Sequence, residues 1–395
     1  MSGRLRQRGV AAVVFLAIFA IILISVLTTA FGGRSVQNEF DAKTLPVLAA
    51  AKQALIAYAA SHPTAPGRLP CPDTQNDGLE HCLVGDQLGR LPWKTLGIPI
   101  PRDGSGECLW YAVSGNFVAT PLTQPINSDA NGTIKVVDDA SPPNVLAGAT
   151  VKSLAVAVIF APGPPFQGND RTPSGPSQCG GNTVATNYLD IAVGVNNALI
   201  AVPAQYVAGT PGPTFNDRLV YITPADLFPS VERRVAGEIR QRLQTYFASN
   251  HYYPFASAIS DLSFACTPSI TRGRLPVTIA ASCSGLADWP TALPAWYQND
   301  HWDMLTFYSV APSCAFPNIS CLPVGGQLTL QNGLLPSNNK QALVIEAGRA
   351  LPTQDRSINT IGNYLDGSEN TNDDDIYTTL PRSPTFNDVV VVVAP

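Results

Sequence analysis

The chain has 395 residues, which is enough for two or three domains. Only 13% of the residues are charged, and the 35 prolines and 31 glycines predict many loops and turns rather than a helical bundle. The net charge of −5 argues against a nucleic-acid partner, because an acidic surface repels a phosphate backbone.

The first element in chain order is a long uncharged stretch. Three arginines and no acid precede Gly9, and the 22 residues from Val10 to Phe31 carry no charge. A helix of that length spans about 33 Å, which is enough to cross a membrane. Three interpretations are open: a secretory signal cut near residues 28–30, a retained anchor whose basic end stays in the cytoplasm, or a helix that is kept after a cut in front of it.

The sequence RQRG followed by VAAVVFLAIFA resembles the leader of type IV pilins and type II secretion pseudopilins. The resemblance implies that a prepilin peptidase cuts after Gly9, so that Val10 becomes the new N-terminus. It also implies that residues 10–31 serve first as a membrane helix and then as part of a filament core. That family usually has Glu five residues after the cut, where this chain has Val14. Family members without the Glu tend to lie at the filament tip.

The remainder of the chain contains an internal duplication. Three pairs of segments match in the same order: KQALIAYAAS with RQRLQTYFAS, NYLD with NYLD, and PTFND with PTFND, at 52–61 and 240–249, 187–190 and 363–366, and 213–217 and 384–388. We therefore expect two copies of one domain, at 32–229 and 230–395. They follow a leader at 1–9 and a transmembrane segment at 10–31.

Each copy is expected to begin with an amphipathic helix. In the second copy, apolar residues recur every three or four positions at Val231, Val235, Ile239, Leu243 and Tyr246. Short β-branched or aromatic runs between Pro, Gly, Asn and Asp follow, and they predict antiparallel strands. The predicted fold class is α+β: an N-terminal hydrophobic transmembrane helix followed by two helix-plus-antiparallel-sheet repeats. The helix, the Pro-rich loop and the Tyr-bearing first strand resemble a pseudopilin head, which implies that the repeats are pilin-like.

The eight cysteines divide four and four between the copies. None lies in a C-x-x-C motif or at metal-ligand spacing from a histidine, so an even number behind an export signal predicts disulfide bonds. Proximity in the sequence favours three local pairs and leaves a fourth: Cys71–Cys82, Cys266–Cys283 and Cys314–Cys321, with Cys108–Cys179 left over.

No catalytic constellation is visible, and we expect a protein that is not an enzyme. The four histidines form neither H-E-x-x-H nor H-x-H, and no G-x-S-x-G or Walker loop occurs. Three tryptophans crowd the second copy, where core packing is expected ahead of a binding face. Asn and Asp recur at matching places in both copies and are expected to cap turns rather than to catalyse: Asn187, Asp190, Asn216 and Asp217, and Asn363, Asp366, Asn387 and Asp388.

One loop is rich in carboxylates. The run DGSENTNDDD at 366–375 contains five of them, and oxygen-rich loops bind Ca²⁺. The spacing is not that of an EF-hand, so a solvated loop is the alternative. Structural calcium is the one cofactor considered, with the candidate ligands Asp366, Glu369, Asp373, Asp374 and Asp375.

Together these features predict a minor pilin or pseudopilin-like subunit of a type IV pilus or type II secretion filament. It would act in assembly or tip capping, and in adhesion. The expected partners are other pilin or pseudopilin subunits, the inner membrane and a prepilin peptidase. The expected location is the bacterial inner membrane, with a single pass and a C-terminal head that is periplasmic or extracellular. The alternative is a membrane-anchored periplasmic binding or adhesion protein outside any filament.

Overall fold

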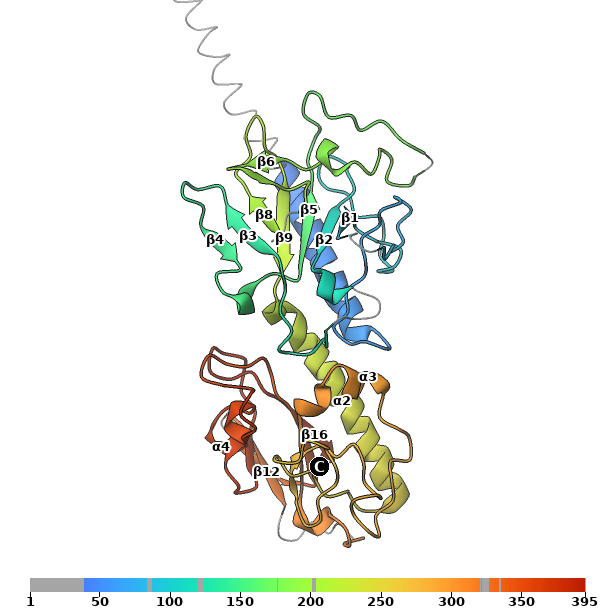
Figure 1. Ribbon diagram of the computed structural model, residues 1–395, viewed down its shortest axis with the longest axis vertical. Coiled ribbons are helices and arrows are strands. Elements are labelled where there is room, and N and C mark those ends of the chain that lie inside the picture. Colours follow the sequence, from blue (N-terminus) through green and yellow to red (C-terminus); the bar gives the residue numbers. More distant parts are fainter. Residues whose placement is uncertain are drawn as a thin grey trace, which may run out of the picture.

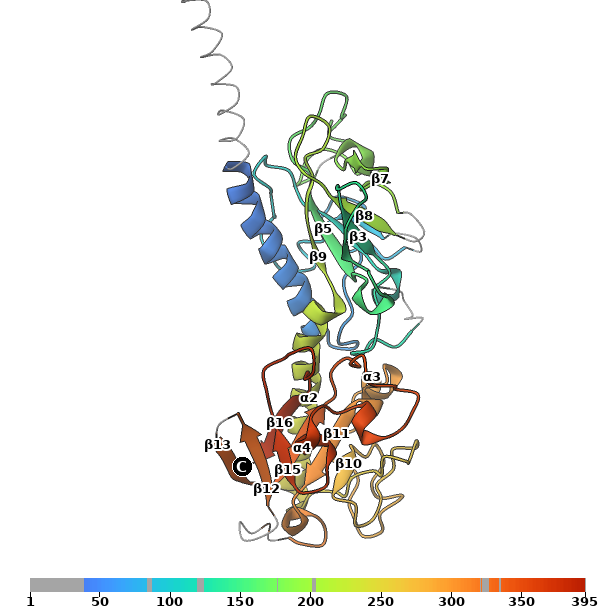
Figure 2. The same ribbon diagram turned by 90° about the vertical axis from the view of Figure 1, so that its left-hand side faces the viewer.

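The computed structural model describes residues 39–394 except 84–86, 119–123, 176, 201–203, 320, 322–326 and 334. In this part of the chain two lobes lie end to end and are joined by the helix α2 (Figures 1 and 2). The helices are a segment at residues 39–61, α2 Pro224–Asn250, α3 Ala295–Asn299 and α4 Ser368–Thr371. Short 3-10 helices lie at Gly115–Phe117, Val151–Ser153, Ala185–Asn187, Trp302–Met304, Pro312–Cys314 and Ile361–Asn363.

A four-stranded antiparallel sheet in the order β1-β2-β5-β9 forms the centre of the first lobe. Its longer strands are rich in β-branched and aromatic residues, which fit a pleated, buried surface. In the register, Tyr111 lies opposite Ile159, which in turn lies opposite Val220. The strands are β1 Leu88–Arg90, β2 Trp110–Val113, β5 Ala157–Ala161 and β9 Arg218–Ile222.

The helix at residues 39–61 covers one face of this sheet (Figure 2). Lys52 Nζ donates to Tyr221 O at 3.0 Å, and Arg218 forms a bidentate ion pair with Asp41 at 2.8 and 2.9 Å. These polar contacts join the helix to β9 at the edge of the sheet. Between helix and sheet lies an apolar core that includes Leu48, Ala51, Leu55, Ala59, Leu109, Tyr111, Val113, Val156 and Ile159.

A second, three-stranded sheet covers the opposite face, in the order β4-β3-β8. Strand β3 pairs antiparallel with β4 and parallel with β8. Trp110 and Phe160 point into this layer, and the ring centroids of Phe160 and Tyr206 are 5.0 Å apart. The strands are β3 Lys135–Asp138, β4 Val145–Ala147 and β8 Gln205–Ala208, with a short hairpin of β6 Ile191–Ala192 and β7 Val195–Asn196 beside them.

The second lobe has the same layers in the same order. Its four-stranded antiparallel sheet runs β10-β11-β14-β16, and its three-stranded sheet runs β13-β12-β15, with β12 parallel to β15. The C-terminal part of α2 takes the place that the helix at 39–61 takes in the first lobe (Figure 1). The strands are β10 Arg272–Arg274, β11 Thr306–Val310, β12 Leu328–Asn332, β13 Leu335–Lys340, β14 Ala342–Glu346, β15 Ile376–Thr378 and β16 Val389–Ala394.

Helix α2 belongs to both lobes. It begins directly after β9 with a capping box, in which Thr223 N donates to Asp226 Oδ2 at 2.8 Å and Asp226 N donates to Thr223 Oγ1 at 3.3 Å. Near this start, Phe228 packs against Phe117 of the first lobe, with ring centroids 6.3 Å apart. Further along, Leu243 is buried in the second lobe. One apolar core therefore runs through both lobes along α2.

The expected α+β fold is wrong. The described residues form a mixed α/β fold with few helices and several small sheets, and two of these sheets contain a parallel pair. Strands β3 and β8 have four residues each and are separated in the chain by β4, β5, β6 and β7. Such short strands show no clear period, and no turn links them, so the sequence does not mark their pairing.

Within the residues that the structure describes, no helix is both long and apolar enough to cross a membrane. This finding contradicts the expected single pass through the inner membrane. The long helices are amphipathic instead: α2, for example, carries half-buried ion pairs of Glu238 with Arg234 and Arg242. The transmembrane helix expected at 10–31 and the cleavage site expected at Gly9 and Val10 lie outside the described residues.

Candidate functional site

The eight cysteines form four disulfide bonds, which confirms that they are oxidised as expected. Two bonds lie in each lobe and close loops of very different length. The pairs are Cys71–Cys82, Cys108–Cys179, Cys266–Cys283 and Cys314–Cys321, the pairing set out above.

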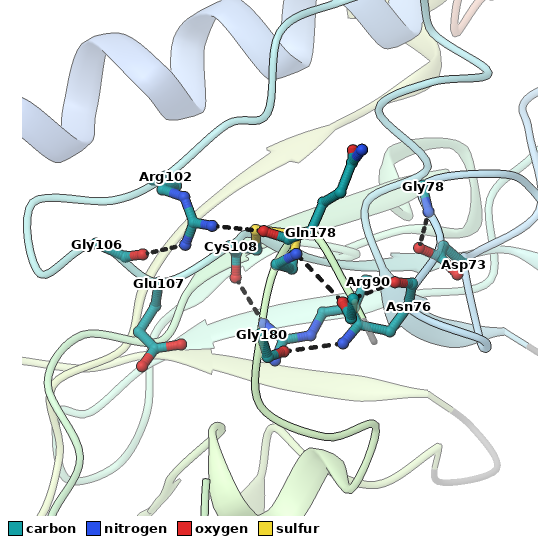
Figure 3. The surroundings of a disulfide bond; sticks show 12 residues. Asp73, Asn76, Gly78, Arg90, Arg102, Gly106, Glu107, Cys108, Gln178 and Gly180 are labelled. Carbon is teal, nitrogen blue, oxygen red and sulfur yellow. Dashed lines mark hydrogen bonds between the residues drawn. A yellow bond between two sulfur atoms is a disulfide. The ribbon is translucent and has the colours of Figure 1, made fainter. Parts of the chain in front are cut away.

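The Cys108–Cys179 bond ties a long Gly- and Pro-rich loop to the start of β2 (Figure 3). Around it, cationic side chains donate to backbone carbonyls. Arg90 binds Cys108 O at 3.0 Å, and Arg102 binds Gln178 O at 2.7 Å. The Arg90 guanidinium is buried and lies 4.6 Å from the Trp110 ring centroid. Because these arginines already donate to backbone carbonyls, the surroundings of this disulfide have a structural role.

The five calcium candidates do not converge on one point. Asp366 is buried, whereas the side chain of Asp373 is 94% exposed and lies 3.7 Å from Arg272. Asp374 Oδ1 accepts the amide of Ile376 at 3.0 Å, as in an ordinary turn. Because these carboxylates contact different neighbours, we do not propose a calcium site in this loop.

Another group of metal-type ligands, Asp73, Asp77 and His81, lies in the first lobe, with ligand atoms within 4.8 Å of one another. The sequence did not single it out. Asp73 accepts the backbone amides of Gly78 at 2.7 Å and Gln75 at 3.0 Å, and Asp77 lies 3.1 Å from His81 Nε2. The carboxylate oxygens of Asp73 and Asp77 therefore already contact residues of their own turn.

The recurring Asn and Asp residues come together as a buried carboxyl pair in the first lobe. Asp190 N donates to Asp217 Oδ2 at 2.9 Å, and Asn216 N donates to Asp190 Oδ2 at 2.8 Å. Asn197 Nδ2 also donates to Asp217 Oδ2, at 2.9 Å. The second oxygen, Asp217 Oδ1, is buried and has no hydrogen-bond partner among the described residues.

The second lobe repeats this arrangement bond for bond. Asp366 N donates to Asp388 Oδ2 at 2.8 Å, and Asn387 N donates to Asp366 Oδ2 at 2.6 Å. Asn370 Nδ2 takes the place of Asn197, at 3.1 Å from Asp388 Oδ2. In this part of the structure too, one buried oxygen, Asp388 Oδ1, lacks a partner. The residues fix local backbone amides, as expected, but the close approach of two carboxyl groups was not foreseen.

Burial is the main cause that raises the pKa of all four carboxyl groups. Repulsion between the two carboxylates raises the pKa of the deeper member further, well above its ordinary value for Asp217 and to about 8 for Asp388. The deeper carboxyl group of each pair therefore releases its proton at a higher pH than an ordinary aspartate does. This arrangement is suited to holding a turn against the last strand of each lobe.

At the junction of the lobes, residues of the second lobe form hydrogen bonds with segment 128–131 of the first lobe. Arg349 Nη1 donates to Ala130 O at 2.7 Å and to Ser128 O at 3.1 Å, and Ala350 N donates to Asp129 Oδ1 at 2.8 Å. Burial lowers the pKa of Arg349, but the guanidinium stays charged far above neutral pH. Segment 128–131 is thereby bonded to the second lobe through two of its carbonyls and the Asp129 side chain.

A buried carboxylate of α2 adds to this junction. Glu232 accepts a hydrogen bond from Ser128 Oγ at 2.8 Å and a charged one from Arg382 Nη2. Asp300, on the other side, accepts the Ile126 amide at 3.3 Å. The junction therefore consists of bonds from several elements of the second lobe to residues 126–131, in addition to the shared apolar core.

Beside this junction lies a cavity of about 550 Å³. Its first-lobe wall includes Asn116 and Asn131, and its second-lobe wall includes His301, Met304 and Tyr364. A smaller cavity of about 340 Å³ adjoins it, and both share Asp129, Asn131 and Arg356 as lining residues. The larger cavity falls in the size range of small-molecule sites, about 300–1,000 Å³.

The cavity was not foreseen from the sequence, and no sequence signal marks it. Its lining residues come from segments that are far apart in the chain and have no shared motif. The four histidines do not gather in it: only His301 lines it, whereas His251 ends α2 in a left-handed conformation. The tryptophans Trp296 and Trp302 are buried in the core, which agrees with their expected packing role.

Comparisons of the chain with protein-family descriptions, with curated proteins and with solved structures return no match.

Proposed function

We propose that the protein is an exported, proteolytically processed structural subunit of a pilin-type filament, present in few copies near the tip. The observation that carries this proposal is the sequence RQRG directly before the uncharged residues 10–31, which resembles a prepilin leader. The four disulfide bonds support it, because such bonds persist in oxidising compartments outside the cytoplasm. Its partners would be other filament subunits and a prepilin peptidase.

The shape of the head supports a position at the tip. The two lobes share one apolar core and are bonded through residues 126–131, so they form one elongated body. A head of this length is easier to accommodate at a tip than within a closely packed shaft. Val14 agrees with this position, since a tip subunit has no subunit ahead whose N-terminal amine needs a carboxylate. We propose no chemical step for the protein.

N-terminal sequencing of the mature protein, from cells that contain a prepilin peptidase, tests the proposal. We expect the mature chain to begin at Val10. Gly9→Ala should abolish this cut, and Gly3→Ala, which changes another glycine of the same segment, should leave it intact. A mature chain that begins at Met1 or near Phe31 would contradict the proposal. Mass spectrometry of sheared filaments should find the protein in far fewer copies than the main subunit.

The second candidate is an exported binding protein that acts outside any filament. The cavity between the lobes favours this candidate, because an assembly subunit has no obvious need for it. Uncut protein that still binds a ligand in this cavity would support the second function over the first.

A further inference from the structure

The walls of the larger cavity are held in place before any ligand arrives. On the first-lobe side, Asn116 Nδ2 donates to Asn131 O at 2.7 Å, and Arg349 of the other lobe donates to Asn131 Oδ1. Asn127 Nδ2 donates to Asp300 O at 2.9 Å, close to the second-lobe wall. A site with walls fixed from both lobes loses little conformational entropy on binding, which favours affinity.

The charges in this cavity are already paired with each other. Asp129 and Arg356 are the charged lining residues apart from the histidine, and their ion pair is 3.2 Å long. Asp129 also accepts the Ala350 amide, and Arg356 donates to the carbonyls of Asn363 and Gly348. A charged ligand would have to break these contacts, because a desolvated ion needs a partner of its own. The cavity thus favours an uncharged ligand.

Several uncharged polar groups remain available to such a ligand. Among the described residues, Asn131 Nδ2 and the ring nitrogens of His301 take part in no hydrogen bond. The exposed ring of His301, which has φ 56° and ψ 33°, lines the cavity.

We propose that the cavity between the lobes binds a neutral oligosaccharide. Carboxamide and imidazole groups each offer a donor and an acceptor, and adjacent sugar hydroxyls need both. The apolar side chains of Pro125, Met304 and Leu305 line the same space and suit the C–H face of a sugar ring.

A peptide strand fits this cavity less well. Peptides that bind by adding a strand need an exposed sheet edge, and the lining residues Asn127, Asp129, Asn131 and His301 lie outside the strands. An anionic ligand is disfavoured because Arg356 is bonded to Asp129 and to two carbonyls. The experiment below includes both as competing outcomes.

The test is binding of the full chain to a panel of neutral oligosaccharides that includes maltotriose, cellotriose and chitotriose, with calorimetry on those that bind. We expect saturable binding that weakens at least fivefold in His301→Asn and in Asn131→Ala. Asn tolerates the left-handed backbone, so His301→Asn removes the imidazole without adding strain. The matched control is His251→Asn, which changes another exposed, left-handed histidine outside the cavity and should leave affinity unchanged.

Equal melting temperatures of the variants and the parent protein would show that the loss comes from the site. Three outcomes would overturn the proposal: no binding across the neutral panel, binding that neither variant weakens, or selective binding of 3′-sialyllactose or a capped tetra-alanine peptide. The inference does not depend on filament assembly. Cleavage after Gly9 and sugar binding are measured separately, so either can fail while the other stands.

Discussion

The two lobes share their strand order and their carboxyl pairs, yet they differ beneath the covering helix. Tyr111 and Tyr308 occupy matching positions, and the hydroxyl of each donates to the carbonyl of a proline. Two residues before these tyrosines, Leu109 in the first lobe corresponds to Thr306 in the second. On the neighbouring strand, Ala161 corresponds to Glu346. Thr306 Oγ1 donates to Glu346 Oε2 at 2.8 Å, and burial raises the pKa of Glu346 well above its usual range. The duplicated scaffold therefore tolerates either an apolar pair or a buried polar pair at this position.

The turns and their carboxyl pairs are the part that does not vary. Arg171 donates to Gly163 O at 2.8 Å and to Asn187 O at 2.9 Å, and Arg356 makes the matching bonds to Gly348 O and Asn363 O. In each lobe the arginine, the turn and the carboxyl pair hold the end of one strand against the last strand. The turns are the same in both lobes, whereas the core residues differ. We therefore infer that the turns set the register of the strands.

The largest expected effect concerns the disulfide bonds, which close loops of unequal length in the two lobes. Replacing Cys108 and Cys179 by Ser opens a loop with a sequence separation of 71, and loop entropy predicts a loss of about 4 kcal/mol of stability. The same change at Cys314 and Cys321, with a separation of 7, should cost about 2 kcal/mol. Urea unfolding without reductant measures both, and equal losses would show that loop entropy does not govern the difference.

The next effect is on pH dependence. The folded state keeps a proton on Asp388 up to about pH 8, whereas the unfolded carboxyl releases it near its ordinary value of 3.8. The folded state therefore binds more protons in this window, and the free energy of unfolding falls as pH rises through it. We expect a loss of roughly 4 kcal/mol between pH 5 and pH 9.

Single replacements assign this pH dependence to a lobe. Asp388→Asn should flatten the dependence of the second lobe, because an amide does not titrate in this pH range. Asp217→Asn should do the same for the first lobe, where the pKa of Asp217 is also raised. Stability that rises between pH 5 and pH 9 in the parent protein would refute the raised pKa of these carboxyl groups.

The smallest expected effect tests whether the lobes unfold together. Arg349→Met removes three hydrogen bonds from the second lobe to segment 128–131 and should cost about 2 kcal/mol. Calorimetry should then resolve two transitions where the parent protein shows one. Arg233→Met, an exposed position on α2, is the control and should change stability by less than about 0.5 kcal/mol. A single transition in Arg349→Met would mean that the shared apolar core and the remaining junction bonds, such as Ser128–Glu232 and Ile126–Asp300, are enough to couple the lobes.

Much of the local structure could be predicted from the sequence. The apolar stripe at Val231, Val235, Ile239 and Leu243 is the buried face of α2, since a 3.6-residue period places these side chains on one side of a helix. The disulfide bonds were predicted from the even number of cysteines and from the short sequence spacing of three of the pairs. These features depend on residues close together in the chain, where spacing carries the information.

The rest depends on residues that are distant in sequence. Strand β3 consists only of KVVD and pairs in parallel with QYVA of β8. No turn residue indicates this pairing, so the predicted fold class was wrong. The same holds for the cavity, which brings Asn116 and His301 together only because α2 aligns the lobes. The proximity of Asp217 to Asp190 was hidden in the same way, since each Asp considered alone fits a turn.

The continuity of β9 and α2 has a mechanical consequence. A pull on the second lobe along the long axis would travel through α2 into β9, which runs on into the helix with only the cap residue Thr223 between them (Figure 1). Strand β9 pairs with β5 over five residues, from Arg218 to Ile222. Tension along that strand would load its hydrogen bonds together in shear rather than one at a time. The arrangement suits a protein that has to transmit force from one end to the other.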